Sequence, residues 1–187
     1  MSSIHWSVKR LRSYNSYISM IVGDRGVGKT YSITKEVLIN DFLKNGTQFM
    51  YIRRKNTELD KIEMFFDDMI VNEEFEGHEF EVRKGQHGGK FYIDGKLAGH
   101  AFPLSLQQYI KSVPWPKVGN IMFDEFIIDE GGSIHYMPNE IVLFLEMVQS
   151  ILRMRWGNIY LVSNALSVGN PYFTYFDINM DFLKEGK

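Results

Sequence analysis

The sequence predicts an α/β fold with a mainly parallel sheet flanked by helices and an antiparallel β-hairpin insertion. Two observations lead to this fold class. Apolar runs of strand length alternate along the chain with segments whose apolar residues recur at helical spacing. Between residues 78 and 102, in contrast, apolar and polar residues alternate around glycine-rich turns, as in antiparallel hairpins. With 187 residues, the chain is expected to form a single domain over residues 1–187.

The first unit combines a strand, a loop and a helix. Tyr17–Val22 is an apolar run that indicates a buried strand, and apolar residues at helical spacing continue from Tyr31 to Leu43. The residues between them match the phosphate-binding pattern G-x-x-x-x-G-K-[ST] at every fixed position. They are Gly23, Asp24, Arg25, Gly26, Val27, Gly28, Lys29 and Thr30. This order of elements favours a nucleotide-binding loop over a glycine-rich turn that has no ligand.

The chemistry of this loop follows from its residue types. Glycines let backbone N–H groups close around phosphate oxygens, and the N-terminus of the following helix favours the same anion. We expect Lys29 to reach the β- and γ-phosphates and Thr30 to offer its hydroxyl to Mg²⁺. The chain has no Asn-Lys-x-Asp motif, with which GTPases recognise guanine, so ATP is the expected nucleotide.

The middle of the chain changes character. Gln48–Ile52 is a second apolar strand, and a polar helix is expected from Glu58 to Val71. Alternating runs between residues 80 and 101 then flank two tight turns, the second of which contains Asp94-Gly95. We therefore expect an antiparallel β insertion at about residues 78–102 of an otherwise α/β domain.

The last third returns to strands that alternate with helices. Val118–Phe123 and Asn158–Val162 are continuous apolar runs typical of buried strands. Between them a helix is expected to begin near Pro138, since proline is tolerated in a first helical turn, and to continue to Leu152. Because strands and helices alternate, a mainly parallel sheet with helices on both faces is predicted.

Two acidic residues, Asp124 and Glu125, follow the Val118–Phe123 strand directly. Ligands of parallel α/β sheets bind outside the carboxyl ends of the strands, so Asp124 is expected beside the phosphate loop, where it would hold Mg²⁺. Glu125 is then placed to deprotonate an attacking water as a general base. The alternative is that two acids simply open a loop after a core strand. The adjacent glutamate favours a hydrolase over a small-molecule kinase, which needs no group that activates water.

Further polar residues are candidates for supporting roles. Asn164 follows the strand Asn158–Val162 and would sense the γ-phosphate if that strand lies beside the Asp124 strand; its alternative role is that of a turn former. Arg25 in the loop, or Arg153 projected into a neighbour's site, is a candidate for stabilising transition-state charge.

Other arginines and a lysine fit two roles each. Arg153 and Arg155 lie near a helix C-terminus, from which either could project into a neighbour's nucleotide site or contact DNA; the alternative is that they compensate the helix dipole. Arg53, Arg54 and Lys55 follow the second strand, on the same edge of the sheet as the phosphate loop. They are candidates for contacts with DNA or with a neighbour's ATP, and the alternative is a solvated run of charges.

Composition excludes several other classes of protein. The absence of cysteine excludes disulfides and zinc–thiolate sites. With a formal net charge of −2, binding to nucleic acid must use a local basic patch. The histidines show no i, i+4 pair, which argues against a metalloprotease-type site. No apolar stretch is long enough to span a bilayer and the first residues lack a signal-peptide core, so we expect a soluble, intracellular protein without a membrane partner.

Several segments taken together carry a family resemblance. They are Ile21–Lys29, Tyr51–Arg54, Phe91–Gly99, Phe123–Phe126, Pro138–Glu140, Ser163–Ala165 and Asn170–Phe173. With them the chain resembles the DNA-packaging (encapsidation) ATPase of small tailed phages of the phi-twenty-nine group, from residue 17 to about residue 176. The run Phe-Tyr-Ile-Asp-Gly-Lys-Leu-Ala-Gly is far more specific to this family than the phosphate loop.

The resemblance implies a fold and roles for individual residues. It implies a P-loop NTPase of the additional-strand conserved-glutamate type, with the phosphate-loop strand between later strands of the sheet. Lys29 and Thr30 match the family's phosphate-loop residues, and Asp124 with Glu125 match its acidic pair. Arg153 falls where the family places an arginine finger that acts in a neighbouring subunit.

Two departures from the family pattern stand out. After Arg53-Arg54 the family commonly has an aromatic residue and then lysine, whereas this chain has Lys55-Asn56, so Lys55 is the residue that would substitute. Family members are nearly twice as long and carry a C-terminal domain that resembles a nuclease. We expect that domain to be absent here because the material is a truncated ATPase domain, which would bind ATP but assemble poorly.

The resemblance also implies partners and a location. Family members form a pentameric ring at the portal of an empty procapsid, in the host cytoplasm, and drive double-stranded DNA inward; a packaging RNA often links ring and portal. The leading hypothesis is therefore a Mg²⁺-dependent ATPase subunit of a genome-packaging motor. A nucleotide-dependent DNA-binding clamp or switch is the second hypothesis, and a small-molecule kinase is the third.

Overall fold

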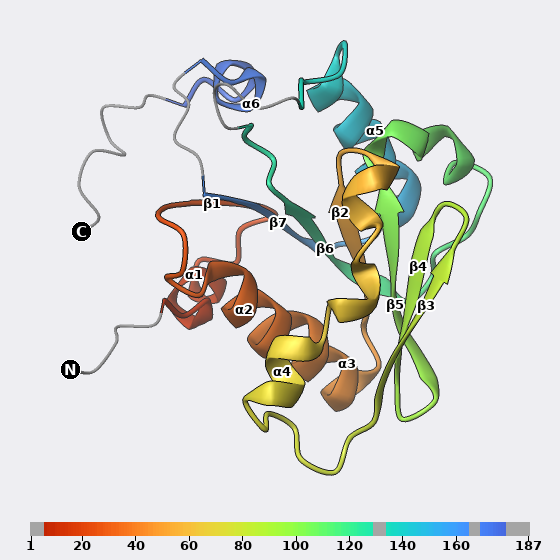
Figure 1. Cartoon of the computed structure of the whole chain (residues 1–187). Coiled ribbons are helices and arrows are strands. Elements are labelled where there is room, and N and C mark those ends of the chain that lie inside the picture. Colours follow the sequence, from red (N-terminus) through yellow and green to blue (C-terminus); the bar gives the residue numbers. More distant parts are fainter. Residues whose placement is uncertain (1–5, 129–133, 165–168, 179–187) are drawn as a thin grey trace.

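A seven-stranded sheet, in the order β1-β7-β6-β2-β5-β4-β3, forms the centre of the computed structural model (Figure 1). The structure describes residues 6–128, 134–164 and 169–178, so the expected domain of residues 1–187 lies partly outside the described residues. The strands are β1 (Ile18–Val22), β2 (Gln48–Arg53), β3 (Phe80–Gly85), β4 (Gly88–Ile93), β5 (Lys96–Pro103), β6 (Val118–Asp124) and β7 (Asn158–Ser163). The neighbouring strands β1, β7, β6, β2 and β5 pair in parallel, and β4 pairs antiparallel with both β5 and β3. The predicted α/β class with a mainly parallel sheet is therefore confirmed.

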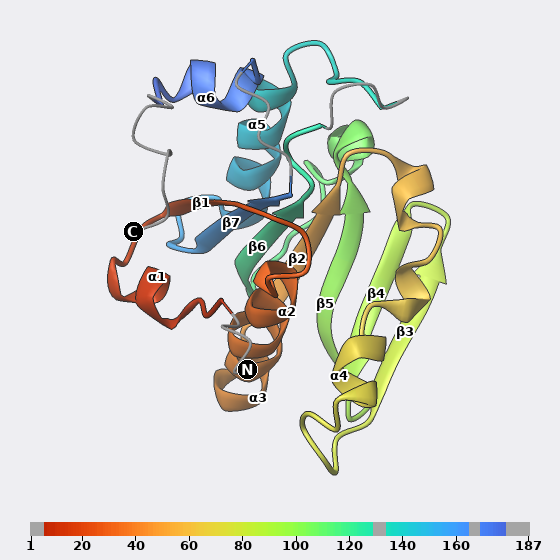
Figure 2. The same cartoon turned by 60° about the vertical axis from the view of Figure 1, so that its left-hand side comes forward.

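Helices cover the two faces of this sheet (Figures 1 and 2). The α-helices are α1 (Lys9–Ser13), α2 (Lys29–Ile33), α3 (Asn40–Asn45), α4 (Asp67–Val71), α5 (Glu140–Leu152) and α6 (Pro171–Tyr175). A π-helical segment, Thr34–Ile39, joins α2 to α3, and short 3₁₀ segments occupy Asn56–Leu59, Ile62–Met64 and Leu104–Tyr109. The helix predicted from Tyr31 to Leu43 is thus present as one run from α2 through α3. None of the helices in the described ranges has the length and apolar character that a membrane crossing requires.

Strand β2 shows why its sequence is apolar throughout. Phe49 and Tyr51 belong to a buried cluster with the α2–α3 run and α4, whereas Met50 and Ile52 belong to a second cluster with α5. Successive side chains of a strand point to opposite faces, and here both faces are covered. The parallel strands therefore lie in the middle of the core.

The polar helix predicted from Glu58 to Val71 is wrong in its continuity. The chain there forms two 3₁₀ turns and the short helix α4. The buried residues of this segment are Leu59, Ile62, Phe66 and Met69. Because they recur every three or four residues, the broken turns bury the same stripe that a continuous helix would bury.

The predicted antiparallel hairpin is present, but it continues the main sheet. β3 and β4 pair antiparallel, and β5 joins the β4 edge to the parallel strand β2. Gly99 lies opposite Phe49 in this junction, and a Cβ atom there would come within 2.7 Å of the Phe49 ring and carbonyl. Only glycine allows so close an approach, so the sheet extends across residues that the sequence pattern assigned to an insertion.

The order of the first strands differs from the expectation that the phosphate-loop strand lies between later strands. Among the described residues, β1 pairs on one side only, with β7. β7 in turn separates β1 from β6, the strand that ends in Asp124. The phosphate loop and the acidic pair therefore leave the same sheet edge two strand positions apart.

Candidate nucleotide-binding site

The phosphate loop connects β1 to α2 and has the backbone that its glycines predict. Gly26 and Gly28 have φ angles of 79° and 85°, and a Cβ atom at either position would meet nothing within 4 Å. The glycines are therefore required by the left-handed backbone and not by crowding. Gly28 is the N-cap of α2, so the first N–H groups of the helix face the loop.

Lys29 folds back across its own loop. Its Nζ donates to the carbonyl oxygens of Gly23, at 2.9 Å, and Asp24, at 2.6 Å, and the residue is 5% exposed. Burial lowers the pKa of Lys29, whereas the charges of Asp24 and Asp124 oppose that shift. The two carbonyl partners are neutral, and a phosphate group in the loop would supply an anionic partner for this buried ammonium.

Thr30 and Asp124 lie together although 94 positions separate them in the sequence: Thr30 Oγ1 donates to Asp124 Oδ1 at 3.4 Å. The other Asp124 oxygen accepts from Tyr51 Oη at 3.0 Å. Burial raises the pKa of Asp124, and the Arg53 guanidinium opposes this rise. A hydroxyl and a carboxylate that converge on one point are the oxygen donors that Mg²⁺ prefers, so these residues fit the cation.

Glu125 follows β6 in a left-handed conformation, with φ of 57°. Its carboxylate accepts from Arg53 Nη2 at 2.5 Å, and the side chain remains 40% exposed. The same guanidinium nitrogen donates to Glu58 at 3.1 Å, and Arg53 Nη1 lies 3.7 Å from Asp124. Although burial alone would lower it, the pKa of Arg53 is raised by Tyr51 and by the Asp124 and Glu125 carboxylates. Arg53 thus joins the two acids that follow β6.

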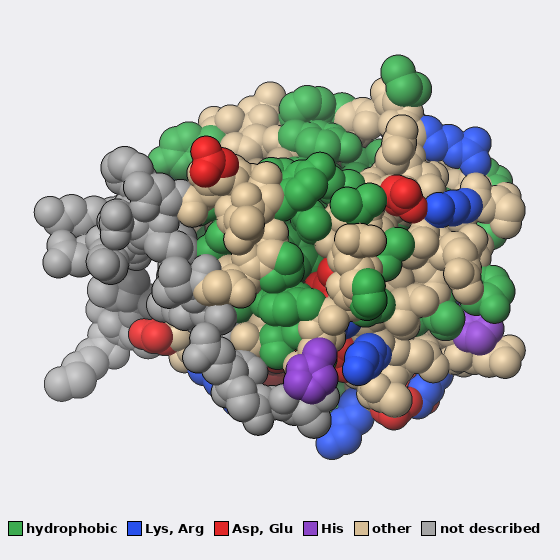
Figure 3. Space-filling model, turned by 90° about the horizontal axis from the view of Figure 1, so that it is seen from above, with side chains coloured by type: hydrophobic (Ala, Val, Ile, Leu, Met, Phe, Trp, Pro, Cys, Tyr) green, Lys and Arg blue, Asp and Glu red, His purple; other side chains and the backbone are tan. Residues whose placement is uncertain are grey.

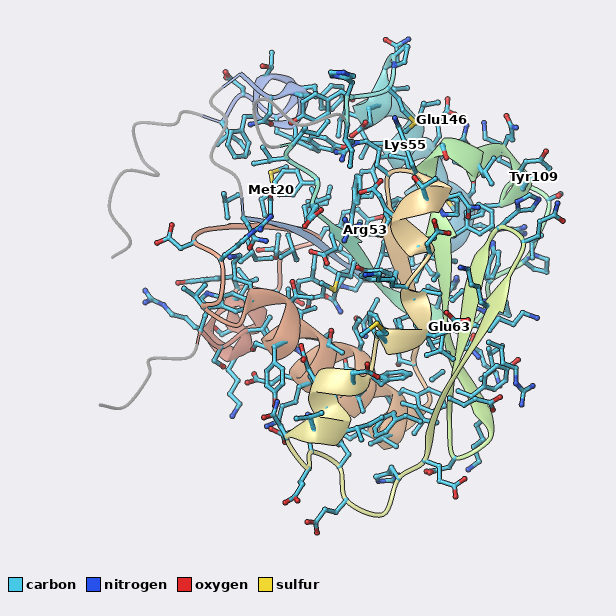
Figure 4. The ribbon with its side chains drawn as sticks, in the orientation of Figure 1. Met20, Arg53, Lys55, Glu63, Tyr109 and Glu146 are labelled. Atoms are coloured by element: carbon cyan, nitrogen blue, oxygen red, sulfur yellow. The ribbon has the colours of Figure 1, made fainter. Side chains whose placement is uncertain are left out.

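The remaining residues of the basic segment after β2 separate from one another. In Figure 4, Arg53 lies beside β2, and Lys55 lies in the loop that leaves the top of that strand. Lys55 is exposed, whereas Arg54 is 1% exposed, in the interior. Of the three, only Lys55 is therefore open to a macromolecular partner in this structure.

The arginines after α5 lie at the amino ends of the parallel strands, whereas the phosphate loop lies at their carboxyl ends. Helix α5 starts beyond the carboxyl end of β6 and ends before the first residue of β7, so Arg153 lies where the strands begin. Arg153 is exposed, and its backbone has φ of 53°. Arg155 donates to the carbonyl oxygens of Trp115, Pro116, Val118 and Ile151, which fastens the end of α5 to the entry of β6. Neither arginine lies beside the chain's own phosphate loop.

A pocket of about 820 Å³ adjoins the phosphate loop. Its lining brings together Gly26, Gly28, Lys29 and Thr30 with Asn164, because β7 pairs with β1 and ends next to it. Arg25 is exposed within the same loop. On the face of the molecule that is seen from above, hydrophobic side chains gather in the middle (Figure 3). The condition set for Asn164, that its strand lies beside the Asp124 strand, is met because β7 pairs with β6.

Several residues of the site carry no signal in the sequence. The Tyr51 side chain points to Asp124, and the Glu58 side chain points to Arg53. Trp6 lines the pocket because its backbone N–H donates to the Val27 carbonyl at 3.1 Å. Strand alternation could have assigned Tyr51 and Arg53 to one face of β2, since they are two residues apart. Nothing in the local sequence identifies Trp6 or Glu58.

Comparisons with known proteins show the family to which this chain belongs. Residues 1–185 match the family model described as Podovirus DNA encapsidation protein (Gp16). The DNA packaging protein of Bacillus phage phi29 is 42% identical over 183 residues, which cover 97% of this chain and 53% of that protein. The chain therefore spans about half the length of this relative.

Solved structures agree with the family match. The crystal structure of the N-terminal domain of the DNA packaging ATPase from bacteriophage phi29 has a TM-score of 0.84 and 41% identity, and the match covers 96% of this chain and 89% of that one. A chain of the bacteriophage phi29 genome packaging motor assembly has a TM-score of 0.81 and 40% identity, over 94% of this chain and 52% of that one. From the family model and these relatives together, we conclude that the chain belongs to the Podovirus DNA encapsidation protein (Gp16) family.

Proposed function

We propose that this chain is the ATP-hydrolysing domain of a motor subunit that moves double-stranded DNA into a viral procapsid. The observation that carries the proposal is the convergence of Lys29, Thr30, Asp124 and Glu125 from two separate strand ends. The relatives named as a packaging protein and a packaging ATPase support the same activity. The strand β7 between β1 and β6 supports the additional-strand conserved-glutamate type of P-loop fold.

Each residue of the site then has a task in hydrolysis. Lys29 exchanges its two carbonyl partners for the β- and γ-phosphates. Thr30 and Asp124 would hold Mg²⁺, which when bound would neutralise charge on the phosphates. Glu125 accepts a proton from the attacking water through the part of its carboxylate that solvent reaches. Asn164, at the end of β7, contacts the γ-phosphate from the neighbouring strand.

Arg153 acts on a neighbouring copy. It is exposed and lies at the sheet edge opposite its own phosphate loop, so it reaches ATP only in another subunit. This geometry supports a ring of identical subunits, and we propose the pentamer, the portal and a packaging RNA as partners at the procapsid vertex in the host cytoplasm. Arg25 remains the second candidate for transition-state charge because it lies in the loop itself.

The test is steady-state ATP hydrolysis by the full protein that carries this domain, with and without duplex DNA. Glu125→Gln is expected to lower kcat at least about a hundredfold while ATP still binds. Glu63→Gln, a change at an exposed acid away from the site, is the matched control and should leave turnover unchanged. Unchanged turnover in Glu125→Gln would overturn the proposal, and phosphate transfer to an added acceptor without DNA dependence would indicate a kinase.

Mixed subunits test the action of Arg153 on a neighbour. In mixtures of wild type with Arg153→Ala, activity should fall faster than the fraction of the variant, because each variant subunit disables an adjacent site. A fall in simple proportion would mean that subunits work independently, and a clamp or switch whose hydrolysis is incidental would then be favoured.

A further inference from the structure

A buried ionic cluster lies behind the candidate catalytic glutamate. Arg54, after β2, pairs with Glu140 at the start of α5: Nε donates to Oε2 at 2.8 Å and Nη2 to Oε1 at 2.9 Å. The two side chains are 2% and 0% exposed. A bidentate pair of this kind fixes the relative orientation of its two partners as well as their distance.

The carboxylate of Glu140 has further donors. The hydroxyl of Tyr172, on α6, donates to Oε1 at 2.7 Å, and the Met137 N–H donates to Oε2 at 2.9 Å. Burial, together with the nearby Glu140 charge, raises the pKa of Tyr172, so the phenol keeps its proton and remains a donor. Helix α6, helix α5 and the end of β2 thus meet at a single carboxylate.

The rest of the Arg54 guanidinium is directed at the backbone of the catalytic segment. Nη1 donates to the Glu125 carbonyl at 3.1 Å, and Nη2 donates to the Phe126 carbonyl at 2.8 Å. The ring centres of Phe123 and Tyr136 lie 5.5 and 5.2 Å from its central carbon. Since Glu125 has a left-handed φ of 57°, a conformation that its own side chain disfavours, these hydrogen bonds hold a strained residue in place.

Stability alone does not account for this cluster. Replacing a buried ion pair by apolar side chains of similar volume is often neutral or stabilising, so such a pair is weak evidence for a stabilising role. What apolar side chains cannot reproduce is the two hydrogen bonds to the Glu125 and Phe126 carbonyls. The specific property of Arg54 is therefore the geometry that it imposes on residues 125 and 126.

We propose that Arg54 is a positioning residue for Glu125, and that Glu140 and Tyr172 hold it so that a displacement of α5 is transmitted to the catalytic carboxylate. This inference rests on the proposed function, in which Glu125 activates water. Arg53 and Arg54 then act as a pair: the first binds the Glu125 carboxylate and the second binds its backbone carbonyl. Arg153 follows the other end of helix α5, about 20 Å from Glu140. A contact of Arg153 with a neighbouring subunit that moves α5 would therefore also move Glu125.

The experiment compares three variants of the full protein: Tyr172→Phe, Glu140→Gln and the apolar pair Arg54→Met with Glu140→Leu. Steady-state kcat, the Kd for a fluorescent ATP analogue and the thermal midpoint are measured for each. The apolar pair is expected to fold with a midpoint close to that of wild type and to bind the analogue within about twofold. Its kcat should nevertheless fall by about a hundredfold, because misplacement of a reacting group by about 1 Å has an effect of that size.

The two single changes should lower kcat by smaller amounts, and they test the proposal even if the double variant does not fold. Glu140→Gln should lower kcat about tenfold, and Tyr172→Phe, which removes one hydroxyl, should lower it a fewfold with Kd unchanged. A purely structural cluster would instead lower the midpoint and weaken analogue binding together with kcat. If the apolar pair does not fold, a wild-type kcat in Tyr172→Phe and Glu140→Gln still overturns the proposal.

Failure of this inference is distinguishable from failure of the proposed function. If Glu125→Gln is slow but the folded apolar pair turns over ATP at the wild-type rate, Glu125 is catalytic and Arg54 does not position it. If Glu125→Gln itself retains full turnover, the proposed function fails, whatever the Arg54 variants do.

Discussion

The parallel and antiparallel halves of the sheet treat charge in opposite ways. In the parallel half, β7, β6 and β2 are buried on both faces, and Arg53 and Asp124 at the strand ends are largely buried and paired. In the antiparallel half, pairs such as Arg83 with Glu81 lie in solvent, with the two side chains 58% and 50% exposed. Arg53 and Asp124 are thus withdrawn from water at the carboxyl ends of neighbouring parallel strands. We therefore propose that the parallel half carries the chemistry and that the antiparallel half contributes stability through backbone packing.

The largest expected effect tests the packing of the antiparallel half. Gly88 begins β4 with φ of 112°, and a Cβ atom there would come within 2.0 Å of the Ala101 carbonyl oxygen. We expect Gly88→Ala to lower the free energy of unfolding by about 3 kcal/mol or more, measured by urea denaturation. Gly95→Ala is the matched control: φ is also positive, at 70°, but the space is open, and the loss should be about 1 kcal/mol. Equal losses would show that close packing is not the cause.

A second prediction concerns the chemistry of the parallel half. Lys29→Ala should weaken ATP binding about a hundredfold, because the phosphates lose charge-assisted hydrogen bonds, while the free energy of unfolding changes by less than about 1 kcal/mol. Fluorescence titration with an ATP analogue and urea denaturation measure the two quantities. Lys44→Ala, at an exposed position of α3 in the same helical run, should change neither. A large loss of stability in Lys29→Ala would break the separation between the two halves.

A third prediction uses pH to probe the antiparallel half. Burial, with the nearby Lys90 charge, lowers the pKa of His100 from 6.5 to about 4. As pH falls below 6.5, His100 binds a proton in the unfolded chain but stays neutral in the folded chain. The free energy of unfolding therefore decreases until about pH 4. The decrease should be roughly 2 kcal/mol, and His100→Gln should remove that part of the slope in urea denaturation between pH 7 and pH 4.5. If His100→Gln leaves the slope unchanged, other groups cause the pH dependence. His78→Gln, at a half-exposed histidine, is the control and should leave this part of the slope in place.

The smallest expected effect concerns the exposed charge pair of β3. Arg83 lies 4.2 Å from the centre of the Tyr92 ring and pairs with Glu81, but both contacts lie in solvent. Arg83→Ala should therefore change neither the thermal midpoint nor ATP turnover to a measurable extent. A clear loss of turnover would place a functional group in the antiparallel half and contradict the division of roles.

The sequence predicts those parts of the fold that depend on local pattern. The phosphate loop, the strands β1, β2, β6 and β7, and the proximity of Thr30 to Asp124 follow from periodicity, glycine placement and the edge rule for parallel sheets. The broken turns between Asn56 and Val71 were not predictable, because broken and continuous helices bury the same stripe of residues.

Other features depend on contacts between distant segments. The sequence identifies Arg53 and Arg54 as adjacent basic residues, yet a turn of the chain directs one to the Glu125 side chain and the other into the interior. The continuation of the sheet through β5 depends on the absence of a side chain at Gly99 facing Phe49. Neither feature has a signature in the sequence near it, because both are set by partners that lie more than 40 residues away.

The pairing of β1 with β7 has a consequence for biosynthesis. Among the described residues, the strand that leads into the phosphate loop pairs only with Asn158–Ser163, so Ile18 has no strand partner until Ile159 has been synthesised. At ordinary rates of translation, that interval lasts roughly 10 to 30 s, and until it ends β1 has no described neighbour to hold it. A ribosome-bound chain that stops before β7 should therefore fail to retain ATP, however complete its Gly-Lys-Thr loop. In the proposed function, nucleotide binding is therefore a late event in the synthesis of the chain, one that follows the synthesis of β7.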